Sequence, residues 1–146
     1  MLEKINVDIV SAMKEHDTLK LSTLRLLKGA VDLERINKRV DKLNDDDIIA
    51  IIAKQIKTRK ESIVEFERGN RQDLIDKTNS EIEILSAYMP EQIGEEELSN
   101  IIEQVIKEVN ATTIKDMGSV MKIVSSKVKG RADMQQVSSI IKSKLN

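Results

Sequence analysis

Proline occurs once in the 146 residues, at Pro90, and glycine occurs only five times. So few turn-forming residues leave little room for the repeated chain reversals of a β-sandwich or barrel. The segments between them favour helix by composition. Apolar residues recur there at intervals of three and four, the spacing of a helix with one buried face. The chain is therefore predicted to be all-α.

Three helical segments are expected before residue 70. The first ends near His16 and Asp17, and the second begins with Asp17 or Thr18 as its N-cap and runs to a loop around residues 37–43. Gly29, inside the second segment, predicts a close approach of a neighbouring helix. The apolar positions expected to form the buried stripe of the second segment are Leu19, Leu21, Leu24, Leu27, Ala30, Val31 and Leu33.

Asn44 and the three aspartates after it are typical of a helix start, where acceptors and negative charge are favoured. Gly69 is expected to end this third helix as a left-handed residue, and Asn70 to cap a fourth helix that stops before Pro90. Three further helices are expected over residues 95–109, 117–128 and 135–145. The break at Pro90 predicts a four-helix N-terminal domain, residues 1–90, and a small three-helix C-terminal bundle, residues 91–146.

Positive charge is concentrated at the C-terminal end. The chain has a formal charge of −1, yet the segment from Ala111 onwards has seven basic and two acidic residues, a net charge of +5. Such a basic segment indicates a polyanionic partner, although a solvated surface explains the charge equally well. A second basic run, residues 54–60, is followed by acidic residues at helical spacing and is better explained as a solvated helix face.

Most classes of reactive centre are excluded by composition. The chain has no cysteine and one histidine, His16, and it contains neither a GxxxxGK[ST] loop nor a GxGxxG turn. The aspartates at 45–47 lack the alternating spacing of a calcium loop. We therefore expect no catalytic residues, no metal site and no cofactor. Lacking both a run of ~20 apolar residues and a signal peptide's apolar centre, the chain is expected to be cytoplasmic, without a membrane partner.

Three segments resemble the GatB/YqeY family: KTRKESIVEFERGNRQDL at 57–74, EIEILSAYMPEQI at 81–93 and DMGSVMKIVSSKVKGRAD at 116–133. The resemblance covers essentially the whole chain, which is similar to a free-standing YqeY-type protein. It implies an all-helical fold whose C-terminal domain is similar to the tail of the amidotransferase B subunit. That enzyme amidates Glu or Asp misattached to tRNA, and its tail contacts tRNA. The matched motif positions are Pro90 at the boundary and then Asp116, Met117, Gly118, Val120, Met121, Lys129, Gly130, Arg131, Ala132 and Asp133.

The resemblance implies a tRNA-associated module without chemistry of its own. Its candidate RNA-binding residues are Lys122, Lys127, Lys129 and Arg131. The family is related to carbon–nitrogen ligases with glutamine as amido donor, but nothing here resembles their catalytic centres. Two alternatives stay open: an adaptor that docks a partner helix, and an accessory of an amidotransferase or another such ligase.

Overall fold

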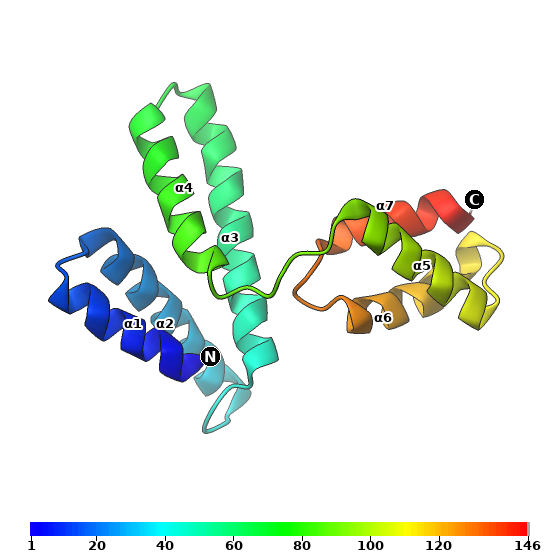
Figure 1. Ribbon diagram of the computed structural model, residues 1–146, viewed down its shortest axis with the longest axis horizontal. Helices are drawn as coiled ribbons and strands as arrows, with labels where there is room; N and C mark the ends of the chain where they lie inside the picture. Colours follow the sequence, from blue (N-terminus) through cyan, green and yellow to red (C-terminus); the bar gives the residue numbers. More distant parts are fainter. Residues whose placement is uncertain (146) are drawn as a thin grey trace. The chain divides into compact units, whose positions relative to one another are not determined.

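The computed structural model describes residues 1–145 and is helical throughout (Figure 1). No strand occurs within those residues, so the predicted all-α class is confirmed. The elements, in chain order, are α1 Leu2–Lys14, α2 Thr18–Lys38, α3 Asp45–Arg68, α4 Gln72–Ser86, α5 Glu95–Val109, the 3₁₀ turn η1 Ile114–Asp116, α6 Met117–Lys127 and α7 Met134–Leu145.

The chain divides into two compact units. Residues 1–89, here called the N-terminal unit, contain α1 to α4. The C-terminal unit begins at Pro90 and contains α5 to α7. Whether each unit folds by itself stays a prediction.

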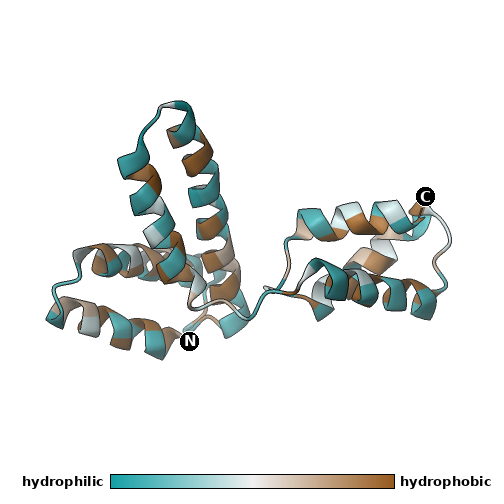
Figure 2. Ribbon diagram, turned by 45° about the horizontal axis from the view of Figure 1, so that its top comes forward, coloured by the Kyte–Doolittle hydropathy of each residue, from teal (hydrophilic) through white to brown (hydrophobic). Residues whose placement is uncertain are grey.

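The N-terminal unit consists of two helical hairpins, α1–α2 and α3–α4, that share a core. In Figure 2 apolar residues recur along each helix without covering it, as expected for helices with one buried stripe. Away from the core, Arg59 and Glu81 join α3 to α4 through a largely buried ion pair of 2.8 Å. The core side chains that are fully buried are Ile5, Leu24, Leu27, Ile48, Ile52 and Leu85.

Local capping accounts for several helix ends. The Asp17 side chain accepts a hydrogen bond from the backbone N–H of Lys20, and Asn44 accepts one from Asp47, at 3.1 and 2.8 Å. Both N-caps agree with the sequence-based prediction. At the end of α3 the prediction was wrong, because Gly69 has φ −88° and the left-handed residue is Asn70, with φ 54°.

The chain therefore turns one residue later than expected between α3 and α4, and Arg71, not Asn70, is the N-cap of α4. Asparagine tolerates the left-handed region because its short polar side chain can bond locally. The close approach predicted at Gly29 is also absent. A Cβ atom added at this glycine would meet no heavy atom within 4 Å.

A hydrogen bond between residues 80 positions apart closes the N-terminal unit. The Tyr88 hydroxyl, at the end of α4, donates to the Asp8 carboxylate on α1, which Lys4 also contacts at 3.2 Å. The Tyr88 hydrogen bond is the main cause that lowers the pKa of Asp8, against the opposing effect of burial. Burial, together with the same hydrogen bond, raises the pKa of Tyr88.

Replacing this tyrosine, Tyr88→Phe, is expected to lower the free energy of unfolding by about 1–3 kcal/mol, because a hydrogen bond to a charged group is lost. Since the pKa of Asp8 is depressed in the folded state, its contribution is present above the ordinary value of 3.8 and is lost as the pH falls below it. Urea unfolding at pH 7 and pH 3 measures both effects. An equal difference between wild type and variant at the two pH values would contradict this role of Asp8.

Candidate nucleic-acid interface

The C-terminal unit is a three-helix bundle with its own core. α5, α6 and α7 each contribute apolar residues on one face, and this leaves their polar residues on the outside. Short helices of this kind depend on tertiary packing more than on intrinsic propensity. The fully buried core residues are Leu98, Ile102, Val105, Val120, Val124, Val128, Val137 and Ile141.

Charge is segregated within this unit. Its sequence, from Pro90 onwards, has eight acidic and eight basic residues, so the unit as a whole is neutral. α5 carries five glutamates and one lysine, whereas the chain from Met117 onwards carries six basic residues and one acidic residue. The basic segment identified in the sequence is therefore one part of a neutral bundle, and a polyanion would be attracted to α6 and α7 but repelled by α5.

The two motifs around Pro90 and Gly130 meet in the structure. The Ile93 N–H donates to the Arg131 carbonyl at 2.8 Å, and the Gln92 side-chain amide donates to the Gly130 carbonyl at 3.0 Å. The Arg131 guanidinium donates through Nε to the Glu91 carbonyl at 3.3 Å. We call residues 91–93 the strap, because these bonds fasten them to the turn between α6 and α7.

The strap gives the motif residues a structural role. Gly130 has φ 74°, a left-handed conformation that glycine adopts without the strain of a Cβ atom. Arg131 is predicted to bind RNA, but one of its hydrogen-bond donors, Nε, already bonds to the Glu91 carbonyl of the strap. A substitution at Arg131 would therefore disturb this turn as well as any surface charge.

Asp116 stabilises the turn that leads into α6. Its carboxylate accepts hydrogen bonds from the N–H groups of Thr112 and Thr113, at 3.0 and 3.3 Å. These two bonds hold its pKa below the usual range. The Asp133 carboxylate accepts a hydrogen bond from the Gln135 N–H at 3.0 Å and caps α7. Met117 and Met121 pack against the core, and Gly118 is exposed.

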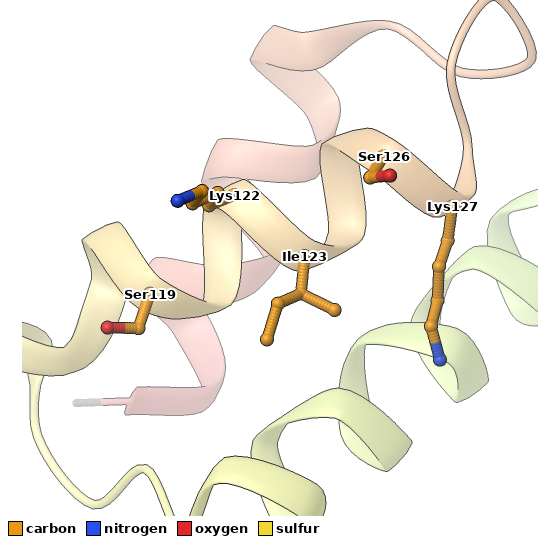
Figure 3. A pocket seen from close by; sticks show the side chains of 5 residues that line it. All are labelled: Ser119, Lys122, Ile123, Ser126 and Lys127. Carbon is orange, nitrogen blue, oxygen red and sulfur yellow. The ribbon is translucent and has the colours of Figure 1, made fainter.

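A shallow, open pocket lies along α6, and of its lining side chains Ile123 and Lys127 point toward α5 (Figure 3). The first lining residue is Ser119, and the others follow it by three, four, seven and eight positions. This spacing places them on one face of the helix. Lys122, Lys127 and both serines are exposed, and Ile123 is half-buried between them. We call this surface the α6 face, and it consists of Ser119, Lys122, Ile123, Ser126 and Lys127.

The polar groups of the α6 face are only weakly engaged. The Lys127 ammonium lies 3.8 Å from the Glu108 carboxylate at the end of α5, and both side chains are about half exposed. Exposed pairs of this kind contribute about 0–1 kcal/mol. Lys122 forms no ion pair with residues 1–145, and the two serine hydroxyls have no hydrogen-bond partner within the same range.

The structure separates the four predicted cations into two pairs. Lys122 and Lys127 lie together on the α6 face, whereas Lys129 and Arg131 follow in the turn after α6. Ser119, Ser126 and Glu108 were not identified from the sequence. The helical spacing of the two serines from Lys122 and Lys127 was the signal that could have found them.

Among residues 1–145, no three His, Cys, Asp or Glu side chains are grouped so as to hold a metal ion. His16, with φ 56°, is exposed in the turn between α1 and α2. Over the same residues, no helix combines the length and apolar character needed to cross a membrane.

Comparison with known proteins identifies relatives along the whole chain. A protein named "Altered inheritance of mitochondria protein 41, mitochondrial" from Pyrenophora tritici-repentis is 30% identical over 142 residues, which are 94% of this chain and 77% of that protein. The protein of the same name from Saccharomyces cerevisiae is 25% identical over 130 residues, 89% of this chain and 69% of that protein. The protein of the same name from Kluyveromyces lactis is 33% identical over 81 residues. These residues are 56% of this chain and 44% of that protein.

These relatives correct the predicted cytoplasmic location, because their names place them in mitochondria. The prediction was based on the lack of an apolar signal-peptide centre at the N-terminus. That criterion detects secretory signals only, since targeting peptides of mitochondria are amphipathic and charged.

The family assignment itself agrees with the resemblance seen in the sequence. The model of the family described as "Yqey-like protein" matches residues 2–145, which include both units, the strap and the α6 face. The chain belongs to the YqeY-like family.

Proposed function

We propose that this protein is a non-catalytic, tRNA-associated module whose C-terminal unit contacts RNA phosphates through the α6 face. The observation that carries the proposal is the pairing of two exposed lysines with two exposed serines on one side of one helix. Lys129 and Arg131 follow in the turn after α6 and would add positive charge near this face, while Arg131 also donates to the strap. The resemblance of the C-terminal segments to the amidotransferase tail makes a tRNA-dependent amidotransferase, or another carbon–nitrogen ligase, the protein assembly in which to look for it.

The chemistry of the α6 face suits phosphate. Lysine ammonium groups supply charge, and serine hydroxyls donate hydrogen bonds to phosphate oxygens. The half-buried Ile123 adds an apolar surface between them, without a group that could read a base edge. The two aromatic residues of the chain, Phe66 and Tyr88, lie in the N-terminal unit, so the C-terminal unit offers no stacking platform. Recognition would then depend on RNA backbone and shape, with little sequence preference.

Glu108 competes with RNA phosphate for the Lys127 ammonium. A phosphate that contacts Lys127 replaces or shares the weak pair with Glu108, which costs little because the pair is long and exposed. Two glutamates of α5, Glu108 and Glu103, pair with Lys127 and with Lys144 of α7 at 3.8 and 2.6 Å, so RNA is expected to approach α6 from the side away from α5. Binding is therefore expected to be electrostatic and strongly dependent on salt.

The test is tRNA binding by the wild type and by Lys122→Glu/Lys127→Glu across a salt series. Each lost phosphate contact lowers the slope of log affinity against log salt by about one unit, so the double variant is expected to lose up to about two units. Its preference among RNA sequences should stay the same. Lys122 and Lys127 are chosen instead of Arg131 because neither holds the strap.

Lys57→Glu/Lys60→Glu on α3 is the matched control, since it changes net charge equally at two exposed lysines of the other basic run. The control should keep the wild-type slope. Equal slopes and affinities for wild type and Lys122→Glu/Lys127→Glu would remove the α6 face as an RNA site. Loss of binding in the α3 control alone would assign the site to α3 instead.

A further inference from the structure

α2 has a second apolar face, which points away from the core. Leu26, Leu33 and Ile36 are 63%, 60% and 61% exposed, and Val40, just after the helix, is 40% exposed. Leu33 was expected from the sequence to be buried and is not. The face opposite contains Leu24, Leu27 and Val31, all in the core.

The exposed positions are arranged as a seam for one partner helix. Leu26, Gly29, Leu33 and Ile36 follow one another at intervals of three and four residues, the a/d spacing of helix pairs. Gly29 leaves open space in the middle of the seam, since an added Cβ atom would have no heavy atom within 4 Å. A large apolar side chain of a partner fits at that position. We call Leu26, Gly29, Leu33 and Ile36 the α2 seam.

Positive charge from Arg25 and Lys28 borders one side of the seam, where the exposed Asp32 also lies. α2 has five basic and two acidic residues over Thr18–Lys38. Arg25 and Lys28, within one turn of Leu26 and Gly29, are exposed and form no ion pair with the described residues. An amphipathic partner helix with carboxylates beside its apolar stripe would complement both features. A second copy of α2 would instead bring two positively charged helices together.

We propose that the α2 seam is a docking site for an amphipathic helix of another protein whose apolar stripe is flanked by Asp or Glu. Helices bind in this way through anchors at i, i+3, i+4 and i+7. The flanking charges select the partner and its orientation more than they add affinity. The site is separate from the α6 face, and its occupation does not require RNA.

The test uses the full chain and two synthetic 21-residue peptides labelled for fluorescence anisotropy. Both carry Leu and Ile at positions a and d, with Glu in one and Lys in the other at positions e and g. Like charges at these positions keep each peptide from pairing with itself. The wild type is expected to bind the Glu peptide about tenfold more tightly than the Lys peptide.

Three variants make the result specific. Leu33→Gln/Ile36→Gln should weaken binding of the Glu peptide by about tenfold or more, because it removes two anchors of the seam. Arg25→Glu/Lys28→Glu should reverse the preference in favour of the Lys peptide. Val7→Gln/Val10→Gln, which changes two exposed apolar residues of α1, is the matched control and should bind as the wild type does.

Several results would overturn the proposal. An acidic helix would be excluded as the partner by any one of three outcomes. The wild type could bind neither peptide, it could bind both peptides equally, or Leu33→Gln/Ile36→Gln could bind the Glu peptide as tightly as the wild type does. Flotation with phosphatidylglycerol vesicles that needs Leu33 and Ile36, without peptide binding, would assign the seam to a lipid surface. Self-association in sedimentation equilibrium that is lost in the same variant would assign it to a second copy.

Discussion

A fragment that begins at Pro90 is expected to fold and to melt cooperatively, whereas a fragment that begins at Glu95 is expected to be mostly unfolded at 25 °C. The two differ by Pro90, the strap and Gly94. Ile93 belongs to the core of the C-terminal unit, and the strap makes three hydrogen bonds to Gly130 and Arg131. The shorter fragment loses all of these contacts.

The loss is large compared with the stability of so small a unit. Burial of an isoleucine side chain stabilises by about 1.5–3 kcal/mol, and each hydrogen bond by about 1 kcal/mol. A single core in a chain of fewer than about 70 residues rarely supplies more than about 3–5 kcal/mol. Removing the strap therefore removes most or all of the free energy that keeps the C-terminal unit folded.

Circular dichroism during heating measures the difference between the fragments. Gln92→Ala in the longer fragment is a milder control and should lower the melting temperature without abolishing the transition, since one of the three bonds to the turn is lost. Identical melting curves for both fragments would show that the strap contributes nothing. Absence of a transition in the longer fragment would show that the C-terminal unit depends on the N-terminal unit.

Features that depend on neighbours in sequence could be predicted. Asp17 and Asn44 cap helices through bonds to residues three positions away. The apolar spacing defined the seven helices and the all-α class. The error at Gly69 was also local, since glycine and asparagine both favour the left-handed region and the sequence ranks glycine first.

Features that depend on distant partners could not be predicted. The Tyr88–Asp8 hydrogen bond spans 80 positions and the Gln92–Gly130 bond spans 38. In the sequence, nothing near Tyr88, Asp8 or Gln92 indicates that its side chain has a distant partner. Periodicity also cannot distinguish an apolar face that is buried from one that is exposed, which is why Leu33 was misplaced. The charge count from Ala111 onwards likewise left out the glutamates of α5, which make the C-terminal unit neutral as a whole.

Ile102→Ala is expected to unfold the C-terminal unit of the full chain and to leave the N-terminal unit folded. Ile102 is fully buried, and truncation of such a side chain costs about 2–5 kcal/mol, comparable to the whole stability of a unit of this size. Hydrogen exchange followed by mass spectrometry reads out each helix separately. Peptides from α5, α6 and α7 should exchange rapidly, while those from α1 to α4 keep the wild-type rates.

Leu24→Ala is the matched substitution in the N-terminal unit, where Leu24 is equally buried. It should speed exchange in α1 to α4 and leave α5, α6 and α7 as in the wild type. The larger N-terminal unit has more stability to lose, so this variant should remain mostly folded. A uniform increase of exchange over both units in either variant would contradict the division at Pro90.

The same pair of variants separates folded structure from charge in RNA binding. If the α6 face binds phosphate as a surface, Ile102→Ala should lose tRNA affinity although every lysine and arginine is still present, because Lys122 and Lys127 no longer share one side of a helix with Ser119 and Ser126. Leu24→Ala should bind tRNA as the wild type does. Full affinity in Ile102→Ala with an unfolded C-terminal unit would mean that positive charge alone attracts the RNA, and that the geometry of the α6 face does not matter.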